Sequence, residues 1–185
     1  MAGVSIRDMT VNDVRQVSSI RIAGWRSAYV GMLPQDYLDG LSVEEDAEQR
    51  RKQFGRNPKV RNVVAERDGA VVGWVVTGPC RDVGATGLDG EIYALYVAPA
   101  MIGTGVGREL VRHVIARARS AGLESMYLWV LEENHRARRF YEAAGFVPDG
   151  ERGHWHMGGA SVPELRYMQV LSGVPTAGQG ERTGL

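Results

Sequence analysis

The stretch from Glu91 to Ala121 constrains the fold more than any other part of the sequence. Residues 91–97 (EIYALYV) are mostly apolar or aromatic and predict a strand, which Pro99 ends. Apolar residues then recur at helical spacing from Val106 to Ala121, and this spacing predicts a long amphipathic helix. A strand, a glycine-rich loop and a helix in this order predict a layered α/β structure.

The remaining segments divide into apolar runs and helical stripes. Capping boxes at Thr10–Asp13 and Ser42–Glu45 open two early helices. The dipeptide Asp68-Gly69 between two apolar runs is a strong hairpin signal. The other predicted elements are strands over 3–7, 60–67, 70–77, 125–131 and 165–171 and one that starts at Phe146, a loop over 78–90, and helices over 11–28, 42–54 and from Asn134 to Gly145.

Composition narrows the class of protein. A length of 185 residues favours one domain, and the 24 glycines follow no Gly-X-Y period, which excludes collagen. Lys+Arg 22 equals Asp+Glu 22, so the formal net charge of zero argues against nucleic acid as the main partner. We predict a single domain over residues 1–172 and, because 173–185 show no periodicity, a flexible C-terminal tail.

The sequence also bears on location. No apolar run reaches ~18 residues, and Met1–Thr10 lacks the apolar segment of a signal peptide. We therefore expect no membrane partner and a cytoplasmic protein. The single cysteine, Cys80, excludes an internal disulfide and a multi-cysteine metal site, and we expect it to be structural. His154 and His156 share a strand face, but two histidines do not make a structural zinc site, so no metal is expected.

Three alternate glycines, Gly103, Gly105 and Gly107, lie between the predicted strand and the long helix. Glycine allows positive φ and a close approach to a ligand, and a helix start offers unpaired N–H groups. The loop, with Arg108 in the first helical turn, therefore suits a phosphate, although a tight turn without a ligand is the alternative. The absence of Gly-Lys-Ser/Thr excludes a Walker A loop, and the glycine spacing disfavours a G-x-G-x-x-G dinucleotide loop.

Two segments together resemble the GNAT family of N-acetyltransferases. Val97-Ala-Pro99 followed by Gly103-Thr-Gly-Val-Gly-Arg108 resembles the family's motif A, and Asn134 to Phe146 matches N-x-x-A-x-x-F-Y-x-x-x-G-F of motif B. The resemblance implies an α/β (α+β) GNAT fold. In this fold a central mixed, mostly antiparallel sheet of six to seven strands is splayed between strands 4 and 5 and flanked by about four helices.

The resemblance implies acetyl-CoA as the co-substrate, with no metal. The pyrophosphate would lie on the glycine loop, and the pantetheine arm would pair with the strand that ends at Val97, like an added strand. The residues that the resemblance assigns to the cofactor are Leu95, Tyr96, Val97, Ile102, Gly103, Thr104, Gly105, Val106, Gly107, Arg108, Asn134, Ala137 and Tyr141.

Motif A departs from the family pattern at one position. Ile102 stands where the family usually has Gln or Arg, so one side-chain contact to the pyrophosphate is missing. Arg108 and Arg138 are candidates to replace it. The run of Arg136, Arg138 and Arg139 is either a solvated face or a contact for the 3′-phosphate of CoA.

The resemblance also implies the catalytic groups. Tyr141 matches the family tyrosine that protonates the CoA thiolate, Glu91 matches the general base of the histone-acetyltransferase branch, and the Val97 N–H is the oxyanion donor. Attack by a primary amine of a small molecule or peptide is direct, within a ternary complex. The alternatives are a core aromatic for Tyr141 and a solvent-facing strand-end carboxylate for Glu91.

Trp25 and Tyr29 lie in the region that borders the acceptor in this family, and they either line an acceptor pocket or pack in the core. The resemblance allows a homodimer. A non-catalytic acyl-CoA-binding regulatory domain of the same fold is the second functional hypothesis, which the isoleucine at position 102 favours. The identity of the acceptor cannot be predicted from the sequence.

Overall fold

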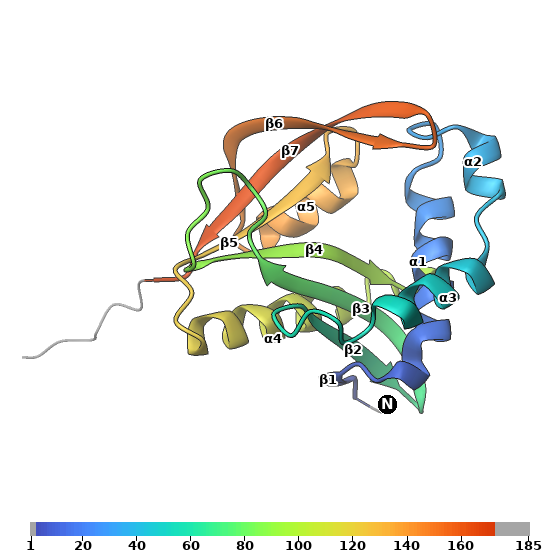
Figure 1. Cartoon of the computed structure of the whole chain (residues 1–185), viewed down its shortest axis with the longest axis horizontal. Coiled ribbons are helices and arrows are strands. Elements are labelled where there is room, and N and C mark those ends of the chain that lie inside the picture. The colour runs from blue at the N-terminus through green and yellow to red at the C-terminus, as the bar shows by residue number, and fades with distance from the viewer. Residues whose placement is uncertain (1–2, 173–185) are drawn as a thin grey trace, which may run out of the picture.

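Seven strands form one sheet in the order β1-β2-β3-β4-β5-β7-β6 within residues 3–172, the part of the chain that the computed structural model describes (Figure 1). The strands are β1 (Ser5–Asp8), β2 (Arg61–Arg67), β3 (Ala70–Pro79), β4 (Asp89–Val97), β5 (Ser125–Leu131), β6 (Val147–Met157) and β7 (Ala160–Val170). The helices are α1 (Val14–Ala28), α2 (Gln35–Asp39), α3 (Val43–Gln53), α4 (Val106–Ser120) and α5 (His135–Ala143), with 3-10 turns η1 (Val11–Asp13) and η2 (Pro99–Met101).

This architecture confirms the predicted fold class. Every strand pair is antiparallel except β4–β5, which is parallel. At the β2–β3 hairpin, Asp68 and Gly69 have φ of 52° and 77°, the left-handed geometry that the Asp-Gly turn predicts. The short helix α2 was not predicted. The tail over 173–185 lies outside the described residues, and the single-domain assignment stays a prediction. Within residues 3–172 no helix is long and apolar enough to cross a membrane.

The sheet opens between β4 and β5, as the resemblance implied. The two strands pair only from Asp89↔Ser125 to Ile92↔Leu128. β5 then continues along β7, whereas β4 continues along β3, and the strands diverge (Figure 1). Tyr93 has no register partner on β3, because Val76 pairs with Ala94 and Thr77 with Ile92. A bulge of this kind bends a strand, and it lies at the point where the strands separate.

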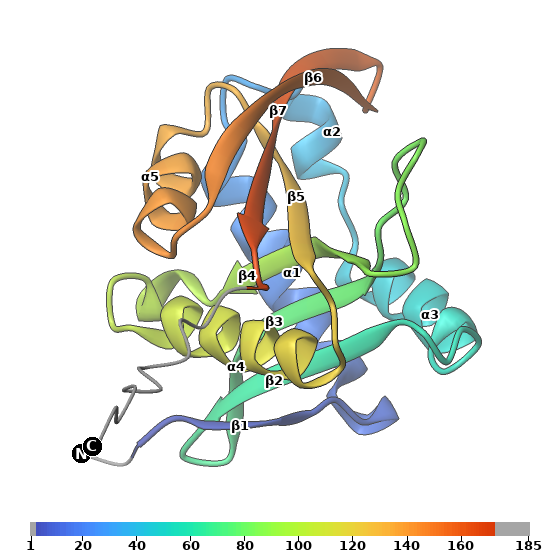
Figure 2. The ribbon, with the colours of Figure 1, turned by 90° about the vertical axis from the view of Figure 1, so that its left-hand side faces the viewer.

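Helices cover both faces of the open sheet (Figure 2). α4 packs its apolar stripe, which includes Leu110 and Val114, on one face of β2–β4. α1 packs on the opposite face, and α3 lies against it. A third apolar cluster links α1 and the α2 region to β5 and β7 around the opening; its buried members are Trp25, Leu33, Leu38, Leu131 and Val162. The opening is therefore bridged by packed side chains at its α1 side.

An ion-pair cluster fixes the start of α1 to the edge of the sheet. Arg7 of β1 donates to both carboxylate oxygens of Asp13 at 2.7 and 2.9 Å, and it also donates to Glu66 of β2. The Thr10 backbone N–H donates to Asp13 at 2.7 Å, the reciprocal half of the predicted capping box. The guanidinium of Arg7, opposed by burial and aided by Thr10, lowers the pKa of Asp13 to about 2.

Replacing Asp13 with Asn should lower the free energy of unfolding by about 1–3 kcal/mol at neutral pH, because hydrogen bonds to a charged group are lost at a buried position. Since the folded-state pKa of Asp13 is lowered, its stabilisation is complete above the ordinary carboxyl pKa and is lost as pH falls from about 4 toward 2. Urea unfolding at several pH values measures both effects.

Asp36→Asn, at the exposed start of α2, is the matched control and should change stability little. If Asp13→Asn and wild type differ by the same amount at pH 2 as at pH 7, the ion pair is not the source of the stability.

Candidate active site

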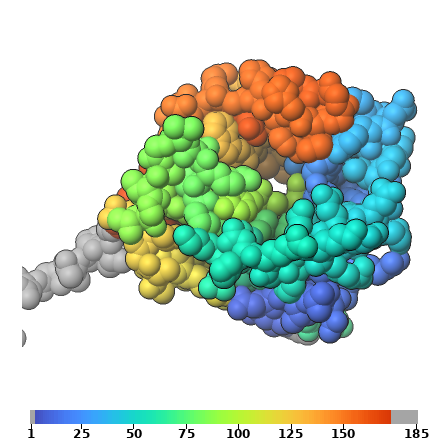
Figure 3. All heavy atoms as spheres, in the orientation of Figure 1, coloured from blue at the N-terminus to red at the C-terminus, as the bar shows by residue number. Residues whose placement is uncertain are grey.

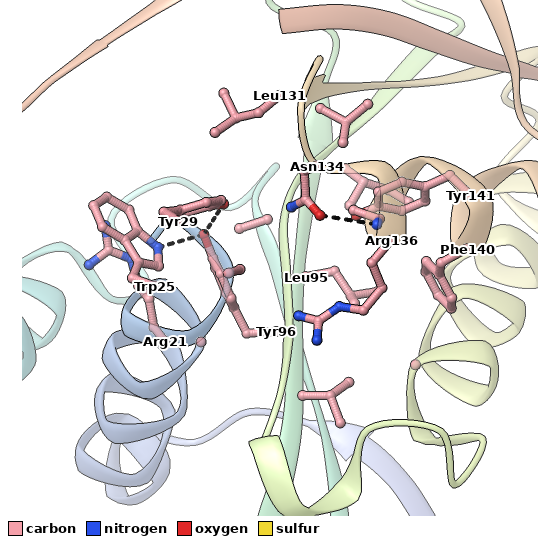
Figure 4. Close-up of a pocket in the computed structure, with 18 of the residues that line it drawn as sticks. Arg21, Trp25, Tyr29, Leu95, Tyr96, Leu131, Asn134, Arg136, Phe140 and Tyr141 are labelled. Carbon is pink, nitrogen blue, oxygen red and sulfur yellow. Dashed lines mark hydrogen bonds between the residues drawn. The ribbon is translucent and has the colours of Figure 1, made fainter. Parts of the chain in front are cut away.

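A cavity of about 950 Å³ lies in the opening of the sheet, with α1 on one side of β4 and α5 on the other (Figure 4). Figure 3 shows the surface hollowed between the orange β6–β7 pair and the blue and teal helices. The cavity brings together all but one of the predicted site residues: Trp25, Tyr29, Glu91, Leu95, Tyr96, Val97, Ile102, Gly103, Thr104, Gly105, Gly107, Arg108, Asn134, Ala137 and Tyr141. The exception is Val106, whose side chain is buried in the core.

The glycine loop has the backbone geometry expected of an anion-binding loop at a helix N-terminus. Gly103 and Gly105 have φ of 82° and 92°, and Gly105 precedes the first residue of the 15-residue helix α4. Gly107 has a different reason to be glycine: a Cβ there would lie 3.2 Å from the Phe140 ring. The first two glycines therefore shape the loop, and the third lets α5 approach α4.

Among the described residues, β4 presents backbone amides to the cavity that no other strand pairs. The Ala98 N–H donates to the carbonyl of Val72 at 2.9 Å, so it points toward β3. In an antiparallel ladder the amides alternate, so those of Leu95 and Val97 point away from β3. β5 has already left β4 at Ile92, and these amides face the opening.

Helix α5 contributes its N-cap and a buried tyrosine. The side-chain oxygen of Asn134 accepts from the Ala137 N–H at 3.1 Å, so Asn134 is the predicted cap. Tyr141 lines the cavity and is 8% exposed, with its ring edge-on to Phe140 and Phe146. It is thus a core aromatic that also borders the cavity. Burial raises the pKa of its hydroxyl above the ordinary value, so the group stays protonated at neutral pH.

Glu91 is fully buried at 1% exposure, so the alternative of a solvent-facing carboxylate is wrong. Arg81, from the loop before β4, holds it. The Arg81 backbone N–H donates to Glu91 at 3.0 Å, and its guanidinium forms an ion pair with the same carboxylate. The loop folds back over the strand, and a linear sequence gives no signal of this contact.

Comparison with known proteins decides the family. The model of the acetyltransferase (GNAT) family matches residues 25–146. A protein of Bacillus subtilis named "Uncharacterized N-acetyltransferase YuaI" is 30% identical over 131 residues, 71% of this chain and 73% of that protein. "Probable N-acetyltransferase Rv2775" of Mycobacterium tuberculosis is 30% identical over 94% of this chain and 98% of its own.

The chain belongs to the GNAT family. By class it is an acetyl-CoA-dependent acetyltransferase. The fold agrees: the PaiA N-acetyltransferase of Thermoplasma acidophilum, solved in complex with coenzyme A, superposes with a TM-score of 0.70 at 16% identity over 91% of this chain and 99% of that one.

Of the three arginines at the start of α5 in this GNAT protein, Arg136 alone lines the cavity. Figure 4 shows its side chain reaching from α5 toward β4. Arg138, a candidate to replace the missing side chain at position 102, instead donates to Tyr167 at 3.2 Å and to the carbonyl of Glu132 at 3.0 Å. The side chain of Arg138 therefore has a structural role, whereas Arg108 and Arg136 line the cavity and could contact a ligand there.

The α1 side of the cavity is aromatic. The Trp25 indole N–H donates to the Tyr96 hydroxyl at 2.6 Å, and the Tyr29 hydroxyl lies 3.5 Å from the same oxygen (Figure 4). Trp155 of β6 packs against the ring of Trp25 and the ring of Tyr29, the residue after α1, at 5.2 and 5.7 Å between centroids. Trp155 was not predicted to be a cavity residue. Because side chains alternate along a strand, Trp155 points to the opposite face of β6 from the residues before and after it.

Those neighbours, His154 and His156, are exposed, and residues 3–172 contain no group of three His, Cys, Asp or Glu side chains placed to hold a metal ion. Cys80 is partly buried, and burial raises the pKa of its thiol.

Proposed function

We propose that the chain transfers the acetyl group of acetyl-CoA to a primary amine of a small molecule or peptide, by direct attack in a ternary complex. The observation that carries this proposal is the content of the cavity. A helix N-terminus lies at one end, unpaired strand amides lie in the middle, and the buried Tyr141 lies beside them. These groups suit a phosphate, a chain of amides and a leaving thiolate.

The pyrophosphate of acetyl-CoA would be bound by the N–H groups at the start of α4. Gly103 and Gly105 allow the backbone to turn these donors toward the ligand. The side chain of Ile102 is apolar, so the positive charge that balances the pyrophosphate must come from other residues. Arg108 and Arg136 line the cavity, and we assign this role to them.

The pantetheine arm would lie along the free edge of β4. The amides of Leu95 and Val97 face this gap, so an amide-containing chain can pair with them as a strand would. At the end of the arm, we assign the Val97 N–H to the thioester oxygen, on which negative charge develops during attack.

The hydroxyl of Tyr141 is our candidate for the general acid. In the reaction a C–N bond forms, the C–S bond breaks, and the leaving thiolate takes the hydroxyl proton. A proton from the attacking nitrogen then passes to the tyrosine oxygen and restores the hydroxyl. The position of the hydroxyl in the cavity supports this role, and its raised pKa means that it is fully protonated before the thiolate forms.

An ammonium must also lose a proton before it can attack, and we assign this step to Glu91. The carboxylate lines the cavity, but Arg81 occupies its oxygens. We therefore propose that Glu91 accepts the proton through a water molecule. A cytoplasmic location and a homodimer stay sequence-based predictions.

Tyr141→Phe should lower kcat about 100-fold, because the proton donor is lost while the ring packing is kept. The Kd for acetyl-CoA should stay within about twofold. Release of CoA thiol over a panel of amines measures the first quantity, and calorimetric titration measures the second. Because the pKa of Tyr141 is raised, wild-type kcat should not fall as pH rises toward 10.

Tyr127→Phe removes a hydroxyl from β5 outside the cavity and is the matched control. An unchanged kcat for Tyr141→Phe would remove the acid assignment. Tight acetyl-CoA binding by wild type without thiol release for any amine would instead favour a non-catalytic acyl-CoA-binding domain.

Arg136→Ala should raise the KM for acetyl-CoA about tenfold, because a charge-assisted contact to phosphate is lost. Arg139→Ala, from the same run but outside the cavity, should leave this KM unchanged. The increase should shrink in high salt. Equal effects of the two substitutions would show that the run acts only as a general positive surface.

A further inference from the structure

The half of the cavity on the α1 side of β4 is left open by the groups assigned to acetyl-CoA. Its walls are the rings of Trp25, Tyr29, Tyr96 and Trp155. The polar atom of Trp25 is committed to Tyr96, so this wall presents mainly carbon to the cavity. Such a surface suits an apolar or aromatic body and disfavours a ligand covered with hydroxyls.

Glu164 of β7 adds an unpaired carboxylate to the same cavity. Within residues 3–172 no hydrogen bond or ion pair to its side chain is present. Its register partner on β6 is Gly153, and a Cβ on that glycine would lie 3.2 Å from Oε1 of Glu164. The carboxylate therefore lies over a position without a side chain, on the same face of β6 as Trp155, two residues further along.

The surrounding charges leave Glu164 free to take a cation. Burial raises the pKa of Glu164, while the positive charge of Arg81 acts in the opposite direction. Arg81 is already paired with Glu91. Arg166 is paired with both Asp82 and Asp149.

The remaining guanidinium at the α1 wall, that of Arg21, is paired with Asp46 at 2.7 Å and stacks on Trp25. On this side of β4 an acceptor carboxylate would thus meet Arg21 and Arg81, which already have partners, since Arg108 and Arg136 are assigned to the phosphates of acetyl-CoA. An acceptor ammonium would meet a carboxylate that has no partner within residues 3–172. Burying an unpaired charge is strongly unfavourable, so this arrangement discriminates between the two.

We infer that the acceptor is a small primary amine that carries an apolar or aromatic body and no carboxylate. Its ammonium binds Glu164, and its body lies against the aromatic wall that Tyr29 and Trp155 form together. This inference rests on the proposed function and narrows its substrate class. Glu164 is assigned to binding the acceptor, and the proton transfers stay with the groups named above.

A substrate series tests the class directly. 2-Phenylethylamine should have a kcat/KM at least about tenfold above that of phenylalanine, which adds a carboxylate to the same body, and above that of putrescine, which lacks the ring. A preference for phenylalanine, for putrescine or for the N-terminus of a peptide would overturn the inference.

Glu164→Gln should raise the KM for 2-phenylethylamine about 10- to 100-fold and leave the KM for acetyl-CoA unchanged, because a hydrogen bond to a charged group is lost from one substrate only. Glu164→Asp should recover part of this loss. Glu151→Gln, an exposed carboxylate of β6 outside the cavity, is the control. An unchanged amine KM in Glu164→Gln would overturn the assignment.

Trp155→Leu tests the wall separately. This substitution should weaken the binding of 2-phenylethylamine more than the binding of butylamine, since only 2-phenylethylamine has a ring that stacks on Trp155. Calorimetric binding of acetyl-CoA to wild type separates the two levels of the hypothesis. Failure to bind acetyl-CoA overturns the proposed function. Binding and turnover with the wrong amine preference overturns only the acceptor class.

Discussion

The early separation of β4 from β5 is the constraint on which the rest of the site depends. Four register pairs hold these strands together, and beyond Ile92 each follows a different neighbour. Backbone N–H and C=O groups inside a sheet are normally hydrogen-bonded to the neighbouring strands. Here the ladder stops within the protein, so β4 keeps donors that a ligand can use. The bulge at Tyr93 and the apolar cluster around Trp25 and Leu131 keep the strands apart.

Charge and apolar surface are distributed unevenly along the cavity. The end near α4 offers a helix N-terminus with Arg108 and Arg136, which favours an anion. The other end offers aromatic rings and the carboxylate of Glu164, which favours a cation with an apolar body. One continuous space thus has opposite preferences at its two ends, and the reacting groups would meet between them.

Much of this could be predicted from local sequence. The Asp68-Gly69 turn, the glycine loop and the Asn134 cap each depend on neighbouring residues, and each has the expected geometry. The start of β7 was missed: a strand was predicted over 165–171, whereas β7 begins at Ala160, which pairs with Met157 of β6. Pro163 lies just beyond Leu131↔Glu164, the last register pair with β5, and its carbonyl still accepts from the Glu132 N–H at 2.9 Å, a bond that a proline can make. The burial of Glu91 by Arg81 and the position of Glu164 depend on tertiary contacts, which no periodicity records.

Tyr96 has a wider consequence for how two ligands share this protein. Its hydroxyl contacts Trp25 and Tyr29, and its chain neighbours Leu95 and Val97 present the free amides. One strand is therefore a common wall for both halves of the cavity. A ligand on the backbone of β4 and a ligand on the aromatic surface would thus contact the same strand. If each ligand favours one position of this strand, their free energies of binding are coupled, and each then changes the affinity of the other by the same factor.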